Sequence, residues 1–262
     1  MEHRVELSLI VPIYQSASHL EAFLRRTMKV ICGLGRTCEL LLVDDGSRDR
    51  TREVLESFLR RAGEDDGAGG QRHIVCRILH LRENVGQQQA SLCGLSHAVG
   101  EAMVTLDDDL QHRPEDIPRL LAALDEGLDL VYGVPVRTHT SGLRRGGSKL
   151  RDMLFFLLFR RNIHPTSFRA LKKGLARAVV EKSEDFLYLS VEFFRYSRRI
   201  GEVPVHYDRL EEHHSRYPLG RLLRTFAGLA LYLPVVPTQL RRRYSGARWT
   251  VVEEKKRGLP CV

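Results

Sequence analysis

The chain has 262 residues, of which 43% are hydrophobic and 28% are charged. This balance is ordinary for a folded protein and excludes collagen-like, mucin-like and wholly disordered chains. Lys and Arg number 41 against 33 Asp and Glu, and the net charge of +8 favours an anionic partner such as a phosphate, a nucleotide, a nucleic acid or an acidic membrane surface. The five cysteines form no Cys-x-x-Cys pair, so the sequence encodes neither a disulfide framework nor a zinc ribbon and favours a reducing compartment.

Short apolar runs alternate with longer periodic segments over the first 135 residues, with predicted strands at 7–12, 39–43, 74–80, 102–106 and 128–131. This alternation predicts an α/β fold with a mostly parallel sheet flanked by crossover helices. The run Leu-Leu-Leu-Val at 40–43 is continuous, which is typical of a strand buried on both faces. A helix is predicted from about Thr51 to just before Gly63.

The sequence shows no signal peptide and no run of the roughly 20 apolar residues that span a bilayer. Residues 137–177, however, hold eleven Lys and Arg against the single acid Asp152, a local net charge of +10. The apolar run 153–159 inside them has basic residues on both sides, and residues 219–243 repeat this pattern. Such segments are typical of amphipathic helices that lie in the membrane interface. The alternative is two core helices with solvated ends.

Asp107, Asp108 and Asp109 directly follow the predicted strand 102–106. Carboxylates two residues apart at the carboxyl end of a strand can aim at one divalent cation, and Mg²⁺ or Mn²⁺ completes its shell with substrate phosphate oxygens. We therefore expect Asp107 and Asp109 to bind metal, with Asp108 turned away or behind them. The alternative is an acidic cap on the following helix.

Asp44, Asp45, Gly46 and Ser47 follow the predicted strand 39–43. The two carboxylates can accept hydrogen bonds from nucleobase N–H groups or ribose hydroxyls, and the glycine permits a tight turn. The alternative is an ordinary strand-to-helix turn in which Ser47 caps the helix.

A third motif follows the strand 74–80 and leads into a predicted helix. Arg82, beside a helix start opened by Gly86, supplies a cation and free backbone N–H donors, which suit a base edge or a diphosphate. The motif is not G-x-G-x-x-G, and no Gly-Lys-Ser/Thr occurs, so neither a dinucleotide oxidoreductase nor a P-loop NTPase is supported. The residues that we expect to bind nucleotide are Pro12, Tyr14, Asp44, Asp45, Ser47, Arg82, Asn84, Gly86, Gln87, Asp107 and Asp108.

These motifs occur together and in a fixed order: PIY at 12–14, VDDGSRDRT at 43–51, LRENVGQQQASLCGLSHAVGE at 81–101 and TLDDDLQHRPEDIP at 105–118. In this order the sequence resembles the family 2 glycosyltransferases with the GT-A fold, and most of all their branch that uses polyprenyl (undecaprenyl or dolichyl) phosphates. The resemblance implies a Rossmann-like GT-A catalytic domain over residues 1–210. It further implies a closing loop, an amphipathic interfacial helix and a tail over residues 211–262.

The resemblance also implies roles for individual residues. It gives the base and ribose to Asp44 and Asp45, Mg²⁺ or Mn²⁺ to Asp107 and Asp109, and the diphosphate to Gln111 and His112. The catalytic residues that follow from it are Asp109, Gln111 and Arg169. Thr166-Ser167-Phe168-Arg169 is similar to an acceptor-side segment whose arginine faces phosphate. The residues expected to bind the acceptor or its phosphate are Arg137, Arg144, His164, Arg169, Ser215 and Arg216, with Arg145 as a further candidate.

Three functions are compatible with these features. The first is metal-dependent, inverting transfer of a sugar from a UDP-, GDP- or dTDP-linked donor to a polyprenyl phosphate. In this reading the protein is cytoplasmic and binds peripherally to the membrane. It could also form homo-oligomers or bind an integral membrane partner. The second keeps the donor site but uses a soluble acceptor, with Glu184 and Asp185 as candidate bases or merely as acids at a helix start. The third is a nucleic-acid-binding or inactive subunit, which is disfavoured because the basic segment lacks interleaved aromatic residues and because Asp107 and Asp109 are intact.

Overall fold

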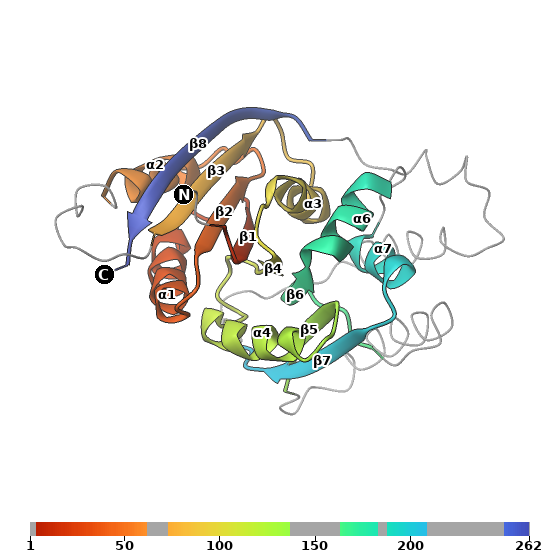
Figure 1. Cartoon of the computed structure of the whole chain (residues 1–262). Coiled ribbons are helices and arrows are strands. Elements are labelled where there is room, and N and C mark those ends of the chain that lie inside the picture. Colours follow the sequence, from red (N-terminus) through yellow and green to blue (C-terminus); the bar gives the residue numbers. More distant parts are fainter. Residues whose placement is uncertain (1–3, 62–72, 137–162, 183–187, 209–248, 262) are drawn as a thin grey trace, which may run out of the picture.

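The computed structural model describes residues 4–61, 73–136, 163–182, 188–208 and 249–261 (Figure 1). In chain order the elements are β1 Leu7–Ile13, α1 Leu20–Gly33, β2 Cys38–Asp44, α2 Thr51–Arg61, β3 His73–Leu81, α3 Gln87–His97, β4 Ala102–Thr105, η1 Pro114–Asp116, α4 Ile117–Asp125, β5 Leu130–Pro135, β6 Arg169–Lys172, α6 Lys173–Lys182, α7 Leu189–Tyr196, β7 Ile200–Val205 and β8 Val251–Pro260.

Within the described ranges the strands form one eight-stranded sheet in the order β7-β5-β6-β4-β1-β2-β3-β8. Strands β1 to β4 pair in parallel, and β5 pairs in parallel with β7. Strand β6 lies antiparallel between β4 and β5, and β8 is antiparallel to β3. The predicted mostly parallel α/β sheet is therefore confirmed, and the predicted strands are present. The strand expected at 128–131 begins later, at Leu130, and continues to Pro135.

Helices cover both faces of the sheet and define two hydrophobic cores. One core joins the sheet to α1, α2 and α4, and the other joins it to α3, α6 and α7. Strand β2 shows how the sequence builds both: Leu40 and Leu42 belong to the first core, while Leu41 and Val43 belong to the second. Because successive side chains of a strand point to opposite faces, an uninterrupted apolar run is needed where both faces are covered.

The register of the parallel strands brings their polar carboxyl ends to one edge. Ile13 at the end of β1 pairs with Asp44 at the end of β2, and Ile10 pairs with Thr105 at the end of β4. The residues that follow these strands must therefore leave the sheet close together, and this is where open α/β sheets place their ligand sites.

Strand β8 lies beside β3 along one edge of the sheet (Figure 1). Residues 251–260 of the segment predicted as a separate tail are thus part of the same sheet. At the end near the carboxyl edge, the backbone N–H of Arg82 donates to the carbonyl of Thr250 over 3.0 Å. An edge strand this rich in charge was not predicted, because Val-Val-Glu-Glu-Lys-Lys-Arg resembles a solvated tail.

No helix in the described part of the chain combines the length and the apolar character that crossing a bilayer requires. The two basic-flanked apolar segments predicted to lie at a membrane interface, 153–159 and 219–243, fall outside the described residues.

Candidate active site

A cleft of about 250 Å³ opens where β1, β2 and β4 end. It is lined by Pro12, Ile13, Tyr14, Asp45, Asn84, Gln87, Asp107, Asp108 and Asp109. A larger hollow of about 950 Å³ lies between α1 and α2 and shares none of these lining residues. We place the site in the smaller cleft because it gathers four carboxylates from two strand ends, whereas the larger hollow combines an apolar floor with a charged rim.

Asp45 fastens the 84–86 loop to the cleft. Its carboxylate accepts hydrogen bonds from the backbone N–H groups of Val85 and Gly86, at 2.7 and 2.9 Å, and from the side-chain amide of Asn84 at 3.0 Å. Burial raises the pKa of Asp45 although the two N–H donors act in the opposite direction. The Asp45 carboxylate therefore holds this loop in the wall of the cleft, and a ligand that bonded to the same oxygens would bond beside the loop's own hydrogen bonds.

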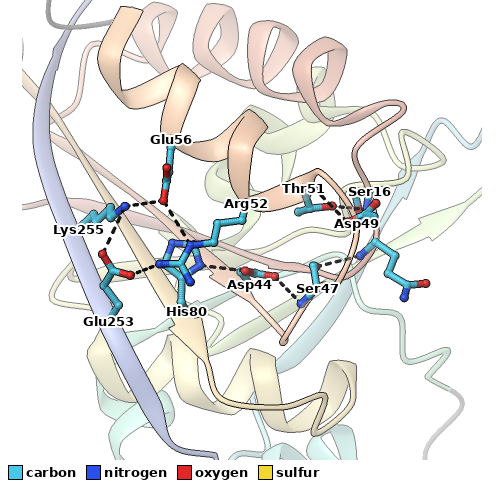
Figure 2. A network of polar contacts seen from close by, with 11 residues as sticks. Ser16, Asp44, Ser47, Asp49, Thr51, Arg52, Glu56, His80, Glu253 and Lys255 are labelled. Atoms are coloured by element: carbon cyan, nitrogen blue, oxygen red, sulfur yellow. Dashed lines mark hydrogen bonds and ion pairs between the residues drawn. The ribbon is translucent and has the colours of Figure 1, made fainter.

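Asp44 has a different environment from its neighbour. One oxygen accepts a hydrogen bond from the ring Nδ1 of His80 over 2.8 Å, and the other accepts from the backbone N–H of Ser47 over 3.0 Å (Figure 2). Its side chain is 5% exposed, and Asp44 does not line the cleft. Asp44 is thus engaged inside the protein by His80 and Ser47, and its expected contact with a nucleotide stays a prediction. Ser47 is likewise turned inward, and its hydroxyl accepts from the backbone N–H of Gln15 at 3.0 Å.

The three consecutive aspartates after β4 all line the cleft. Asp107 accepts hydrogen bonds from the side-chain amide of Gln87 and the hydroxyl of Ser167. Asp109 accepts from the backbone N–H of Gln111 at 3.0 Å. Asp108, expected to be turned away or behind the other two, lines the cleft with Oδ2 buried. Among the described residues this oxygen accepts no hydrogen bond, and the ring Nε2 of His19 lies 3.9 Å from it.

The electrostatics of these aspartates are those of crowded, partly dehydrated anions. Burial raises the pKa of all three carboxyl groups. For Asp108, burial and then the charges of Asp107 and Asp109 raise the pKa to about 7. A cation bound beside them would reverse this effect, because it favours the charged form of each carboxylate.

Metal binding by these aspartates requires help from other ligands. Over the residues that the structure describes, no group of three or more His, Cys, Asp or Glu side chains converges to hold an ion by itself. The donor set of the three aspartates is nevertheless all oxygen, and among the described residues the buried Oδ2 of Asp108 accepts no hydrogen bond. This set fits a hard divalent cation such as Mg²⁺ or Mn²⁺ that takes its remaining ligands from phosphate oxygens and water.

Gln111 and His112 follow the aspartates and contact residues 207 and 208, just after β7. Gln111 receives a hydrogen bond from the Tyr207 hydroxyl, and its backbone carbonyl accepts from the N–H of Asp208 at 2.8 Å. His112 is 6% exposed and packs against the rings of Phe168 and Tyr207. Burial lowers the pKa of His112, so its neutral form is favoured.

Arg169, expected to face an acceptor phosphate, is 2% exposed. Its guanidinium donates to the hydroxyls of Thr105 and Ser190, at 3.1 and 3.3 Å, and lies over the ring of Phe193. The side chain holds β6 to β4 and α7 from within, because Arg169 lies on a central strand of the sheet. Its expected role toward an acceptor phosphate stays a prediction. It is a neighbour of Asp107, and its positive charge acts to lower the pKa of that carboxyl group.

His164 and Arg82 occupy the periphery. His164 contacts the Glu202 carboxylate through its backbone N–H and its ring, and its expected acceptor contact stays a prediction. Arg82 is exposed and does not line the cleft, although it directly precedes the loop that does. The other expected residues, which are Arg137, Arg144, Arg145, Glu184, Asp185, Ser215 and Arg216, lie outside the described residues.

Sequence reasoning missed His80 and Tyr207, and it gave Ser167, which donates to Asp107, only as part of the acceptor-side segment. His80 carried a signal that was available: it is a polar side chain within the buried apolar run 78–81, and buried polar groups need a partner. Tyr207 carried none, since it reaches Gln111 from 96 positions further along the chain.

Comparison with known proteins gives a consistent result. The model of the family described as "Glycosyl transferase family 2" matches residues 8–181. Two similar curated proteins are the undecaprenyl-phosphate 4-deoxy-4-formamido-L-arabinose transferases of Salmonella paratyphi B and Salmonella newport. Each is 31% identical over 237 residues, which cover 90% of this chain and 69% of the relative.

Solved structures show the same fold at low sequence identity. A complex of glucosyl-3-phosphoglycerate synthase from Mycobacterium tuberculosis with Mn²⁺, uridine diphosphate and glucosyl-3-phosphoglycerate has a TM-score of 0.61 and 19% identity, over 89% of this chain and 81% of that one. A complex of TarS from S. aureus with UDP has a TM-score of 0.53 and 17% identity, over 90% of this chain and 68% of that one.

Proposed function

The chain belongs to glycosyl transferase family 2 and is a glycosyltransferase with the GT-A fold, and we propose that it transfers a sugar from a nucleoside-diphosphate donor to a polyprenyl phosphate. The observation that carries the proposal is the convergence of Asp45 and Asp107–Asp109 on one cleft at the carboxyl ends of β2 and β4. The relatives named as undecaprenyl-phosphate sugar transferases support the choice of acceptor.

The donor occupies the cleft in this proposal, with the base toward Tyr14 and Asp45 and the diphosphate toward the three aspartates. Tyr14 is 45% exposed, which leaves its ring available for stacking on a base. Gln87 and Ser167 hold the carboxylate of Asp107 from two sides, so its position is set before any ligand enters.

A divalent cation is part of the proposal, held by Asp107 and Asp109 with the free oxygen of Asp108 close by. The Mn²⁺ in the mycobacterial synthase complex and the all-oxygen donor set of this chain support it. When bound, the cation supplies positive charge that neutralises the leaving diphosphate. Asp108 then regains the ionised state that burial opposes in the free protein.

The remaining catalytic role in this proposal belongs to Gln111, near the diphosphate. Its side chain accepts a hydrogen bond from the Tyr207 hydroxyl, which holds it in place. The acceptor phosphate is ionised at neutral pH, so it attacks without a strong general base. This is consistent with a site in which His112 is buried and favours its neutral form.

The site of action in this proposal is the cytoplasmic face of the membrane, where the protein binds peripherally. The basic segment 137–177, with its net charge of +10 from eleven basic residues and one acid, supports attraction to anionic lipid. Cosedimentation with vesicles of anionic phospholipid, compared with neutral vesicles, measures this contact directly.

The deciding experiment supplies UDP-, GDP- and dTDP-sugars with Mn²⁺ and a short-chain polyprenyl phosphate, and follows organic-extractable product by mass spectrometry. Asp109→Asn is the test variant. Asp125→Asn, at the end of α4 and paired with Arg36, is the matched control that removes an equal charge away from the cleft. We expect a glycosyl-phosphoryl-polyprenol from the wild type and the control only. Metal-dependent nucleotide release without a lipid product would reject the polyprenyl phosphate and identify a different acceptor.

A further inference from the structure

His80 lies buried beneath the 44–47 turn, outside the cleft itself. It is 1% exposed, and its Nδ1 is 2.8 Å from Oδ2 of Asp44. Strand register makes this contact, because His80 and Asp44 are paired residues of β3 and β2. A carboxylate can only accept hydrogen bonds, so His80 is the donor and carries a proton on Nδ1.

The contact continues from His80 to the loops that border the cleft. The second oxygen of Asp44 holds the backbone N–H of Ser47, and the Ser47 hydroxyl holds the backbone N–H of Gln15. Gln15 has a φ of +52°, a left-handed conformation that is strained for a residue other than glycine. It directly follows Tyr14, which lines the cleft. The position of this loop therefore depends on a turn that His80 secures from below.

The 44–47 turn also packs directly against the backbone of residues 83 and 84, at the opposite wall of the cleft. A Cβ atom at Gly46 would lie 2.7 Å from the backbone carbon of Glu83 and 2.8 Å from the backbone nitrogen of Asn84. The next wall residues, Val85 and Gly86, are held by Asp45. The turn and the 83–86 loop are thus in backbone contact, and a shift of one must move the other.

Strand β8 closes the outer side of this arrangement (Figure 2). Glu253 is the register partner of His80 on β8 and forms an ion pair with Arg52 of α2. Lys255 reaches Glu56 of α2 at 2.6 Å. These contacts hold β8 against β3 and α2, so His80 lies between the edge strand β8 and the 44–47 turn.

We propose that His80 is a positioning residue of the nucleotide subsite: through its hydrogen bond to Asp44 it holds the 44–47 turn, and with it the cleft walls at Tyr14 and Asn84, in the geometry that binds the nucleoside diphosphate. The inference rests on the proposed function. His80 does not touch the ligand, and its effect passes through Asp44.

Three variants separate this role from general stability. His80→Leu removes the donor at similar volume, whereas the side-chain amide of His80→Asn places a donor near the position of Nδ1. Ile78→Val trims a fully buried side chain on the same strand, two residues before His80, without touching the turn. If His80→Leu does not fold, His80→Gln, whose amide donor lies nearer the position of Nε2, takes its place.

The measurements are calorimetric titration with UDP, GDP and dTDP in turn, each with Mn²⁺, and the KM and kcat for the donor. We expect His80→Leu to weaken nucleotide binding and raise KM about tenfold, which corresponds to about 1.4 kcal/mol, with a smaller change in kcat. His80→Asn should bind within about threefold of the wild type, and Ile78→Val should match it.

Two outcomes would overturn the proposal. Equal nucleotide affinity in His80→Leu and the wild type would show that the turn keeps its place without His80. Equal weakening in His80→Asn and His80→Leu would show that the lost hydrogen bond is not the cause. If the wild type itself binds none of the three nucleotides, the proposed function fails first, and that result is distinguishable from both.

Discussion

Asp108→Asn tests whether the aspartates after β4 are arranged for a cation rather than for the stability of the free protein. The substitution keeps the shape of the side chain and removes its charge. In the folded chain, burial and the charges of Asp107 and Asp109 raise the pKa of Asp108 from 3.8 to about 7. Because the folded pKa lies above the unfolded one, the contribution of Asp108 to stability is present at low pH and is lost as pH rises toward 7.

The magnitude follows from the size of the shift. Each unit of pKa difference corresponds to about 1.4 kcal/mol, so ionisation of Asp108 between pH 5 and pH 8 removes roughly 2–3 kcal/mol from the free energy of unfolding. The side chain is only 13% exposed, so solvent screens little of this effect. Because asparagine does not titrate, the variant does not lose this part of the free energy of unfolding as pH rises.

The assay is urea denaturation with a chelator present, at each pH unit from 5 to 8. From pH 5 to pH 8 the free energy of unfolding of the variant should rise relative to that of the wild type by roughly 2–3 kcal/mol. Added Mn²⁺ should reduce this difference in unfolding free energy at pH 8. Asp129→Asn is the control: although burial opposes it, the ion pair with Arg199 lowers the pKa of Asp129, so its stability difference should stay flat between pH 5 and 8. A flat difference for Asp108→Asn as well would refute the reasoning.

Three further predictions follow from individual contacts. Gly46→Ala should lower the free energy of unfolding by about 1–3 kcal/mol in urea denaturation, because φ is +67° and the new Cβ would meet the backbone at Asn84; unchanged stability would contradict the packing of the turn. Arg169→Lys should lower the free energy of unfolding by about 1–3 kcal/mol in the same denaturation, since a lysine cannot reproduce the buried guanidinium contacts. An unchanged unfolding midpoint with a raised KM for the acceptor would instead support its predicted phosphate role. Cys38 and Cys93 should react slowly with iodoacetamide at pH 8 and rapidly in urea, as followed by mass spectrometry, because burial raises the pKa of each thiol to about 12.

The sheet and the place of the cleft could be predicted because both follow from local patterns. The run at 40–43 identifies a strand buried on both faces, and Asp44 marks where it stops. The same logic places Asp107 after β4. Parallel strands deliver their carboxyl ends to one edge, so the polar residues that follow them must be neighbours, and no knowledge of strand order is needed.

Contacts that depend on register or on distant segments could not be predicted. The pairing of His80 with Asp44 requires knowing which residue of β3 lies opposite the end of β2. Strand β8 pairs with β3 from a distant part of the sequence: Arg77 and Glu254, which are in contact, are 177 positions apart. The charged residues that make β8 look like a solvated tail also hold it in place, through Glu253 and Lys255. The burial of Arg169 could not be predicted for a related reason: a motif gives the residue type but not the direction in which a strand points its side chain.

Asp44 and Asp45 show why two identical adjacent residues come to do different work. Asp44 is still part of β2, so the pleat places its side chain on the same face of the sheet as that of its register partner His80 on β3. Asp45 has left the strand, and its backbone N–H donates to Ile13 at the end of β1 over 2.8 Å, which turns its carboxylate toward the cleft and the 84–86 loop. Sliding β2 by one residue along β3 would instead place Asp45 opposite His80. The register and the end point of β2 therefore determine which carboxylate secures the turn and which one lines the cleft.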